Sequence, residues 1–192
     1  MALRRGFKTE ANATASEIRA ELKLHSIAPL NPWELANHLE IPVMTLSSFG
    51  PTIPTAVAYF LEKDTKAFSA MTVFDGTRRA IVYNDSHSKS RQASDISHEI
   101  SHGVLLHTPR QVFDGSGCRD WNEDEEDEAN WLAGVLLITE AAAISVVRRG
   151  LTIEQAAAEY CVSTQMMRWR INATGAHTRV NRTRNYRRGN RF

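Results

Sequence analysis

Apolar residues recur every three or four positions over seven segments of the chain, which is the spacing of one buried face on an α-helix. Capping residues support several of the boundaries: Asn31 followed by Pro32, Thr139, and Thr152 three positions before Gln155. The predicted helices are 11–23, 32–39, 91–107, 123–138, 140–149, 152–160 and 164–173. Helices therefore make up most of the predicted fold.

A second pattern lies between the second and third predicted helices, where β-branched and aromatic residues are bounded by glycine and proline. These runs are predicted strands at 41–46, 56–61, 67–74 and 80–83. Asp75-Gly76, between the last two, is a hairpin signal. The sequence thus predicts an α+β, mainly helical fold with a small three- to four-stranded sheet. An edge strand of this sheet could hold a substrate backbone by strand addition, or the sheet could only close the core.

The C-terminal part follows a helix-turn-helix pattern, in which Ala157, Cys161, Ser163 and Met167 supply an alanine, a turn, a serine cap and a buried apolar residue. Such turns usually contain glycine where Cys161 stands, so packing on the preceding domain is favoured over DNA reading. The segment 179–191 holds six arginines, as in disordered tails that bind phosphate backbones weakly and without sequence specificity.

The composition is that of one main domain with a small appendage. With 192 residues, 42% of them hydrophobic, the chain can bury a core, and its net charge of +1 does not indicate a partner. Two cysteines form no disulfide framework, and the longest apolar run has eight residues, so we expect a cytoplasmic protein with no membrane contact. The predicted organisation is a flexible leader at 1–10, a main domain at 11–138, a C-terminal helical element at 139–176 and a basic, disordered tail at 177–192.

Candidate chemistry is concentrated in the predicted helix 91–107. Residues four apart lie on the same face of a helix, so His98 and His102 can offer two imidazoles to one ion. Glu99 lies about 100° round the helix from His98, where it can hold a water without coordinating the ion. This His-Glu-x-x-His spacing supplies two ligands and a general base in zinc hydrolases. His107 is predicted to continue the helix as a structural histidine.

A third metal ligand must come from elsewhere, and the acidic residues 123–128 supply the candidates. The positive end of a helix dipole favours carboxylates in the first turn, which explains most of them. Glu126 and Asn130 lie four apart, a spacing that suits a carboxylate ligand followed by a residue that orients a ligating imidazole. Glu125 is the runner-up, whereas Glu128 points roughly 160° away from Glu126.

In combination these segments resemble the ImmA/IrrE family of zinc metallopeptidases. The segments that carry the resemblance are IVYN at 81–84, HEISHGVLLH at 98–107, EDEANWLAGVLL at 126–137 and YCVSTQMMR at 160–168, with further similarity at 30–43. The resemblance implies a zincin-like catalytic domain of the gluzincin type over 11–138. In it His98, His102 and Glu126 bind one zinc ion, with manganese as an alternative, and Glu99 is the base. Thr139 departs from the family, which often has proline there.

The resemblance further implies an endopeptidase that cleaves a separate protein, a helix-turn-helix repressor of the XRE type. The alternative is a non-enzymatic regulator, stabilised by zinc, whose C-terminal helices and arginine-rich tail bind DNA or a repressor. A hydrolase of small substrates is a further alternative. Tyr83, His107 and His177 are the candidate donors to the reaction's oxyanion. The loop 110–122 is predicted to overhang the cleft.

Overall fold

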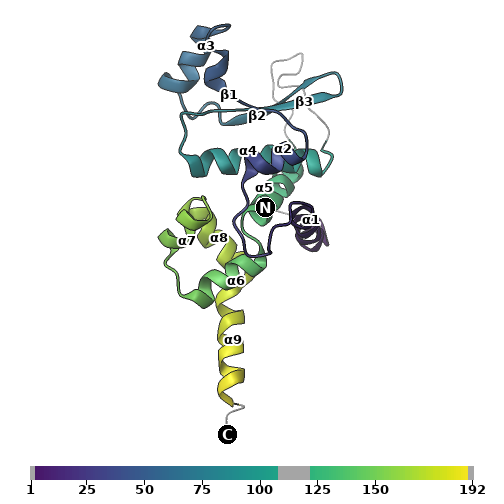
Figure 1. Ribbon diagram of the computed structural model, residues 1–192, viewed down its shortest axis with the longest axis vertical. Helices are drawn as coiled ribbons and strands as arrows, with labels where there is room; N and C mark the ends of the chain where they lie inside the picture. Colours follow the sequence, from purple (N-terminus) through teal and green to yellow (C-terminus); the bar gives the residue numbers. More distant parts are fainter. Residues whose placement is uncertain (1–2, 108–121, 190–192) are drawn as a thin grey trace.

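A small sheet lies at one end of the molecule and helices form the rest, as the ribbon of the computed structural model shows (Figure 1). The structure describes residues 3–107 and 122–189. The helices are α1 (Phe7–Glu21), α2 (Pro32–His38), α3 (Pro54–Ala58), α4 (Lys89–Val104), α5 (Glu123–Leu137), α6 (Glu140–Arg149), α7 (Ile153–Glu159), α8 (Thr164–Thr174) and α9 (Ala176–Gly189). The strands are β1 (Val43–Thr45), β2 (Ala70–Asp75) and β3 (Arg78–Tyr83). The predicted α+β, mainly helical fold is confirmed.

The sheet has the order β1-β3-β2, with β1 parallel and β2 antiparallel to β3. The predicted Asp75-Gly76 hairpin is confirmed, because Asp75 pairs with Arg78 and Gly76 has the positive φ of 59° that such a turn needs. β2 has a sheet partner on one side and therefore forms an edge of the sheet.

The strand predicted at 56–61 is wrong, because this segment is helical. Pro54 opens α3, and a π-helical turn, η2 (Tyr59–Lys63), follows it. Val57, Phe60 and Leu61 are three and four positions apart, so a helix turns all three towards the sheet, where they pack together. The predicted strand 41–46 is shorter than expected, because Thr45 caps a 3₁₀ turn, η1 (Leu46–Phe49).

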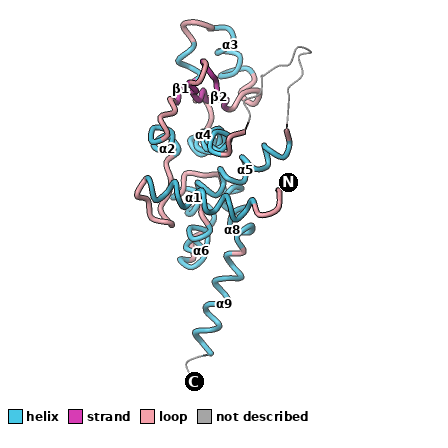
Figure 2. Tube along the Cα trace, turned by 90° about the vertical axis from the view of Figure 1, so that its right-hand side faces the viewer, coloured by secondary structure: helices cyan, strands magenta, loops and turns pink. Residues whose placement is uncertain are grey.

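The two faces of the sheet contact different helices. Ile81 and Tyr83 belong to the main core on the face towards α4, whereas Val82 packs with Leu46 and Val57 on the face towards α3. The tube view, turned by 90°, likewise places α3 and α4 on opposite sides of the sheet (Figure 2). The sheet therefore lies between a large core and a much smaller apolar cluster.

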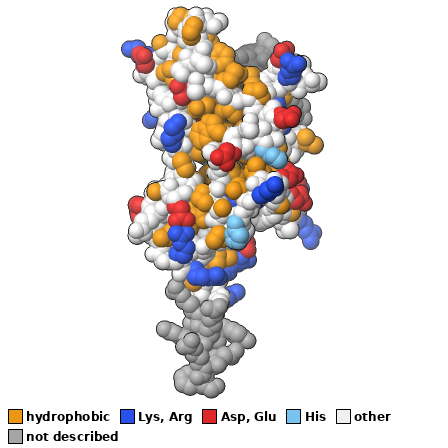
Figure 3. Space-filling model, viewed as in Figure 1, with side chains coloured by type: hydrophobic (Ala, Val, Ile, Leu, Met, Phe, Trp, Pro, Cys, Tyr) orange, Lys and Arg blue, Asp and Glu red, His pale blue; other side chains and the backbone are white. Residues whose placement is uncertain are grey.

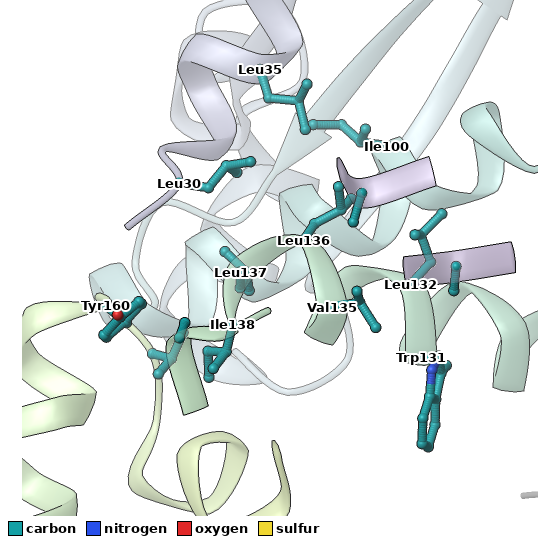
Figure 4. Packing of buried hydrophobic residues seen from close by; sticks show 14 of the residues in the cluster. Leu30, Leu35, Ile100, Trp131, Leu132, Val135, Leu136, Leu137, Ile138 and Tyr160 are labelled. Atoms are coloured by element: carbon teal, nitrogen blue, oxygen red, sulfur yellow. The ribbon is translucent and has the colours of Figure 1, made fainter. Parts of the chain in front are cut away.

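The main core is built around α5. Its residues Trp131, Leu132, Val135 and Leu136 are buried and contribute to one cluster with Ile100 of α4 (Figure 4). These side chains bring α4 and α5 into extensive contact. The pairing of the two helices is what brings their polar residues to one place.

The predicted leader at 1–10 is shorter than expected, because α1 begins at Phe7. The Phe7 side chain is completely buried in the main core, together with Ala11 and Ala15 of the same helix. Phe7 lies four positions before Ala11, so its ring faces the core from the same side of the helix. Its burial explains why the helix begins one turn before the predicted start at residue 11.

Arg19 of α1 is buried and satisfies backbone carbonyls of two other segments. Its Nη2 donates to the Leu136 carbonyl at 2.8 Å, and its Nη1 donates to the Ala28 carbonyl at 2.8 Å. Arg19→Met keeps a long, unbranched side chain but leaves these carbonyls without their donors, so we expect a loss of about 1–3 kcal/mol in the free energy of unfolding. Urea unfolding measures this loss, with the exposed Arg5→Met as the matched control; equal stability of the two variants would contradict the assignment.

The caps predicted for the C-terminal helices are confirmed at Thr139, Thr152 and Ser163. Cys161 adopts φ 50°, the left-handed conformation that the helix-turn-helix turn requires, although it is not glycine. α8 packs against α5 and α6, with the Trp169 ring edge-on to Trp131. α8 of the helix pair therefore packs on α5 of the main domain.

The tail predicted as disordered at 177–192 is helical over most of its length, because α9 extends from Ala176 to Gly189 and projects away from the body (Figure 1). Ala176 and Val180 are buried, and Arg179 forms an ion pair with Glu140 of α6. These contacts fix the first turns of α9, and arginine itself favours helix formation.

Within 3–107 and 122–189, no single helix combines the length and apolar character needed to cross a membrane. α5 and α6, bent by 50° at the break between them, meet these criteria together, by length and composition alone. Most of their apolar residues belong to the main core.

Candidate metal centre

Two helices bring two histidines and a carboxylate to one point. The Nε2 atoms of His98 and His102, both on α4, are 3.0 Å apart. Glu126 of α5 places Oε2 3.2 Å from Nε2 of His98 and Oε1 3.5 Å from Nε2 of His102. One ligand atom from each residue lies within 4.8 Å of the others, so the three residues could hold a metal ion.

The helical repeat explains why these side chains face the same way. Ala93, Ile96 and Ile100 form the buried face of α4, which leaves the face carrying His98 and His102 for the partner helix. Glu126 lies one turn before Asn130, at the partly exposed start of α5, ahead of its fully buried part. The structure therefore brings together all three residues predicted as metal ligands.

The charges at this point favour a cation. Burial alone would raise the pKa of the Glu126 carboxyl, but hydrogen bonds from His102 and His98 hold it well below its usual range. Burial disfavours a charged His98, yet its hydrogen bond to Glu126 and the negative charges of Glu99 and Glu126 raise its pKa overall. Two imidazoles and an ionised carboxylate form a donor set that suits zinc.

Asn130 orients one of the two imidazoles. Its Oδ1 lies 3.1 Å from Nδ1 of His98 and, with the amide oriented this way, accepts a hydrogen bond from that nitrogen. Nδ1 then carries the ring proton, so the Nε2 lone pair is available to a metal ion. This contact matches the role predicted for Asn130.

We expect Asn130→Ala to weaken zinc binding by about 10- to 100-fold, because His98 loses the partner that fixes its ring and its tautomer. Competition with a chromogenic chelator measures the affinity. Asn172→Ala, at an exposed position of α8, is the matched control, and an Asn130→Ala variant with the affinity of this control would refute the orienting role.

Glu99 lies beside the same centre and is held by the sheet. The hydroxyl of Thr72, on the edge strand β2, donates to Oε2 of Glu99 at 2.7 Å. This bond fixes one carboxylate oxygen and leaves Oε1 for other partners. Sequence reasoning missed Thr72, because nothing in the sequence of a strand indicates which helix residue its side chain will meet.

The other glutamates near the start of α5 have different surroundings from Glu126. Glu125, the runner-up ligand, lines the same cavity but is not part of the group that could hold the ion. Glu128 turns away from Glu126, as predicted, and pairs with His107 and Arg4. Of the three glutamates, Glu126 is therefore the one grouped with the two histidines.

His107 does not continue α4 as predicted. The helix ends at Val104, Leu106 adopts φ 55°, and the backbone N–H of His107 donates to the His102 carbonyl at 3.0 Å. The chain therefore turns back and sets the His107 ring against His102. Burial and the neighbouring His102 lower the pKa of His107. Thr108 and Pro109, which were predicted to end the helix, lie outside the described residues.

Two of the three candidate oxyanion donors are placed unfavourably. Tyr83 is 7% exposed and its ring packs edge-on against Trp33. His177 is an exposed residue in the first turn of α9 and does not line the cavity that contains His98 and His102. The predicted loop at 110–122 and its Cys118 lie, apart from Asn122, outside the described residues.

A cavity of about 1390 Å³ is lined by the three residues that could hold a metal ion and continues along the sheet. Its walls beyond the histidines are mainly apolar and include Phe49, Phe60, Phe68, Met71 and Val73. The space-filling view shows apolar side chains gathered over the upper half of the molecule, which contains the sheet (Figure 3). The polar centre is therefore one end of a larger apolar cleft.

Comparison with known families identifies the fold and the general class of activity. The family model described as IrrE N-terminal-like domain, peptidase M78, matches residues 36–172. This range includes the sheet, the three residues that could hold a metal ion and all but the last two residues of the helix-turn-helix unit. Searches of curated proteins and of solved structures gave no significant match. Because the matched region covers most of the chain, the protein belongs to the IrrE N-terminal-like family of M78 peptidases.

Proposed function

We propose that the protein is a zinc-dependent metalloendopeptidase. The observation that carries this proposal is the convergence of His98, His102 and Glu126 on one point, with Glu99 held next to it by Thr72. A metal that only stabilised the fold would not need an oriented carboxylate beside it. The family match supports a peptidase independently of this geometry.

In this proposal His98 and His102 supply neutral Nε2 donors and Glu126 supplies a carboxylate oxygen. Bound there, zinc would lower the pKa of a coordinated water towards about 7 and polarise the scissile carbonyl. The donor set fits zinc and also tolerates manganese, since imidazole and carboxylate ligands suit both ions.

Glu99 acts as the general base and then as the general acid. Its carboxylate accepts a proton from the attacking water and gives that proton to the leaving amine. The hydrogen bond from Thr72 keeps Oε2 in place during both transfers, so Oε1 is the oxygen that carries the proton.

The cleft suits an extended peptide better than a small molecule. β2 is an edge strand, and a substrate strand could pair with its backbone beside Glu99. Side chains of a paired strand alternate between two directions, so some would enter the apolar part of the cleft and others would face α4. We therefore propose a substrate segment with large apolar side chains at alternate positions.

The proposed natural substrate is a separate helix-turn-helix repressor of the XRE type, because the family resemblance implies this class. The test incubates the zinc-loaded chain with a panel of purified XRE-type repressors and with an unfolded control protein, and maps the products by mass spectrometry. We expect one or a few cuts, flanked by apolar residues, in a repressor. Cleavage of the unfolded protein alone would support the peptidase but reject the repressor as its substrate.

The rival function is a regulator that binds DNA or a repressor without cleaving it. The feature that favours this function is the charge of the C-terminal end, which has eight arginines and no acidic residue after Glu159. We propose that this end adds weak, salt-sensitive contact with nucleic acid to the peptidase activity. Binding to a random DNA duplex should fall steeply as salt is raised.

A further inference from the structure

We propose that His107 is a positioning residue for the metal ligand His102, and that Glu128 and Arg4 hold His107 in place. The inference rests on the proposed metal site and adds three side chains to it, those of His107, Glu128 and Arg4. These side chains connect the metal centre to the segment that precedes α1.

The first contact fixes the tautomer of His102. Nδ1 of His102 and Nδ1 of His107 are 2.9 Å apart, a hydrogen-bond distance. His102 turns its Nε2 towards His98 and Glu126, so metal binding requires the ring proton to be on Nδ1. Nδ1 of His102 therefore donates, and Nδ1 of His107 accepts.

The second contact follows from the first. Once Nδ1 of His107 accepts, its Nε2 carries the proton, and this nitrogen lies 3.7 Å from Oε2 of Glu128. The His107 and Glu128 side chains are 10% and 13% exposed, so little water screens their attraction. A carboxylate behind an imidazole makes that ring a better hydrogen-bond acceptor and its partner a more basic ligand.

Arg4 completes the chain of contacts. Its Nε lies 2.8 Å from Oε1 of Glu128, the oxygen that does not face His107, and its Nη2 donates to Glu10 at 2.6 Å. The guanidinium also lies over the Phe7 ring, which is buried in the core. Glu128 is thus held from both sides, by an arginine and by a histidine.

The turn after α4 places His107 against His102. Leu106 adopts φ 55° in a Schellman motif, a common helix ending: its N–H donates to the Gly103 carbonyl at 3.3 Å, and the N–H of His107 donates to the His102 carbonyl at 3.0 Å. This motif reverses the chain, so His107 returns to His102 instead of continuing away from it.

His107 is not itself placed as a metal ligand. It contacts Nδ1 of His102, whereas the proposed ion would lie at Nε2, on the opposite side of that ring. The residues grouped around the proposed ion are His98, His102 and Glu126. The two imidazole ligands therefore have different supports: an amide behind His98 and a histidine-carboxylate pair behind His102.

The test measures zinc affinity of the full chain by chelator competition, without any peptide substrate. We expect His107→Phe, which keeps a ring but removes the acceptor, to bind zinc about 10- to 100-fold more weakly than wild type. His107→Gln offers a side-chain oxygen to Nδ1 of His102 and should recover much of the affinity. A ring that only packed would show the opposite order, with phenylalanine closer to wild type than glutamine.

Arg4→Ala and Glu128→Gln extend the test to the outer contacts and stay informative if His107→Phe does not fold. Both should weaken zinc binding, by less than His107→Phe, whereas the exposed His38→Phe should not. Wild-type affinity in His107→Phe, or in both outer variants where His107→Phe does not fold, would overturn the inference and leave the peptidase proposal intact. Failure of the wild type to bind zinc would overturn both.

Discussion

Replacing Glu99 with glutamine is expected to slow peptide hydrolysis by about 10²- to 10⁴-fold, the range that a general acid-base residue contributes. Glutamine has nearly the same shape and its side-chain oxygen can still accept from Thr72, but it cannot accept the water proton. The metal ligands His98, His102 and Glu126 are untouched, so zinc content should stay at one ion per chain.

Turnover of a cleaved repressor or peptide and zinc content measured on the same preparation separate catalysis from metal binding. Asp124→Asn is the matched control, because Asp124 is an exposed acid near the site that is not among the grouped ligands. Full turnover in Glu99→Gln would exclude Glu99 as the general base, whereas a zinc-loaded wild type that cleaves none of the substrates would favour the non-enzymatic regulator.

Glu126→Ala is expected to abolish tight zinc binding, with a fall in affinity of more than about 100-fold, since losing a ligand should cost more than losing a residue that orients one. The variant leaves two imidazoles, one fewer protein ligand than catalytic zinc sites normally have. It also removes the negative charge that faces both Nε2 atoms. Hydrolysis should disappear with the metal.

Metal content and zinc titration of the purified variant measure this effect. Asp124→Ala, which removes another acid from the first turn of α5, should retain one zinc per chain. Glu125→Ala tests the runner-up ligand directly. If Glu125→Ala lost the metal and Glu126→Ala kept it, the ligand assignment would move by one residue along the helix.

The grouping of the candidate site residues could be predicted from sequence because their positions depend largely on spacing within single helices. His98, Glu99 and His102 share α4, and Glu126 and Asn130 share α5, so helical geometry alone decides which side chains face together. The contacts missed depend on how the sheet packs and where the chain turns. Thr72 meets Glu99 only because β2 packs on α4, and His107 meets His102 only because the chain reverses after Val104.

The errors in the fold have similar causes. The segment 56–61 is rich in residues that favour strands, but Val57, Phe60 and Leu61 have helical spacing, and packing against the sheet outweighs their propensity. The segment 1–10 was predicted to be a flexible leader, and 177–192 to be disordered because it is rich in arginine. One buried side chain at each end, Phe7 and Val180, extends a helix into each of these segments.

The central claim is that one zinc ion is held by side chains of α4 and α5, and X-ray absorption spectroscopy of the zinc-loaded protein tests it most directly. The account predicts a shell of nitrogen and oxygen ligands at about 2.0–2.2 Å, with the outer scattering of two imidazoles and no sulfur. Glu126→Ala should lose this spectrum. A zinc–sulfur distance of about 2.3 Å, or a spectrum without two imidazoles, would place the metal elsewhere and contradict the proposed catalytic centre.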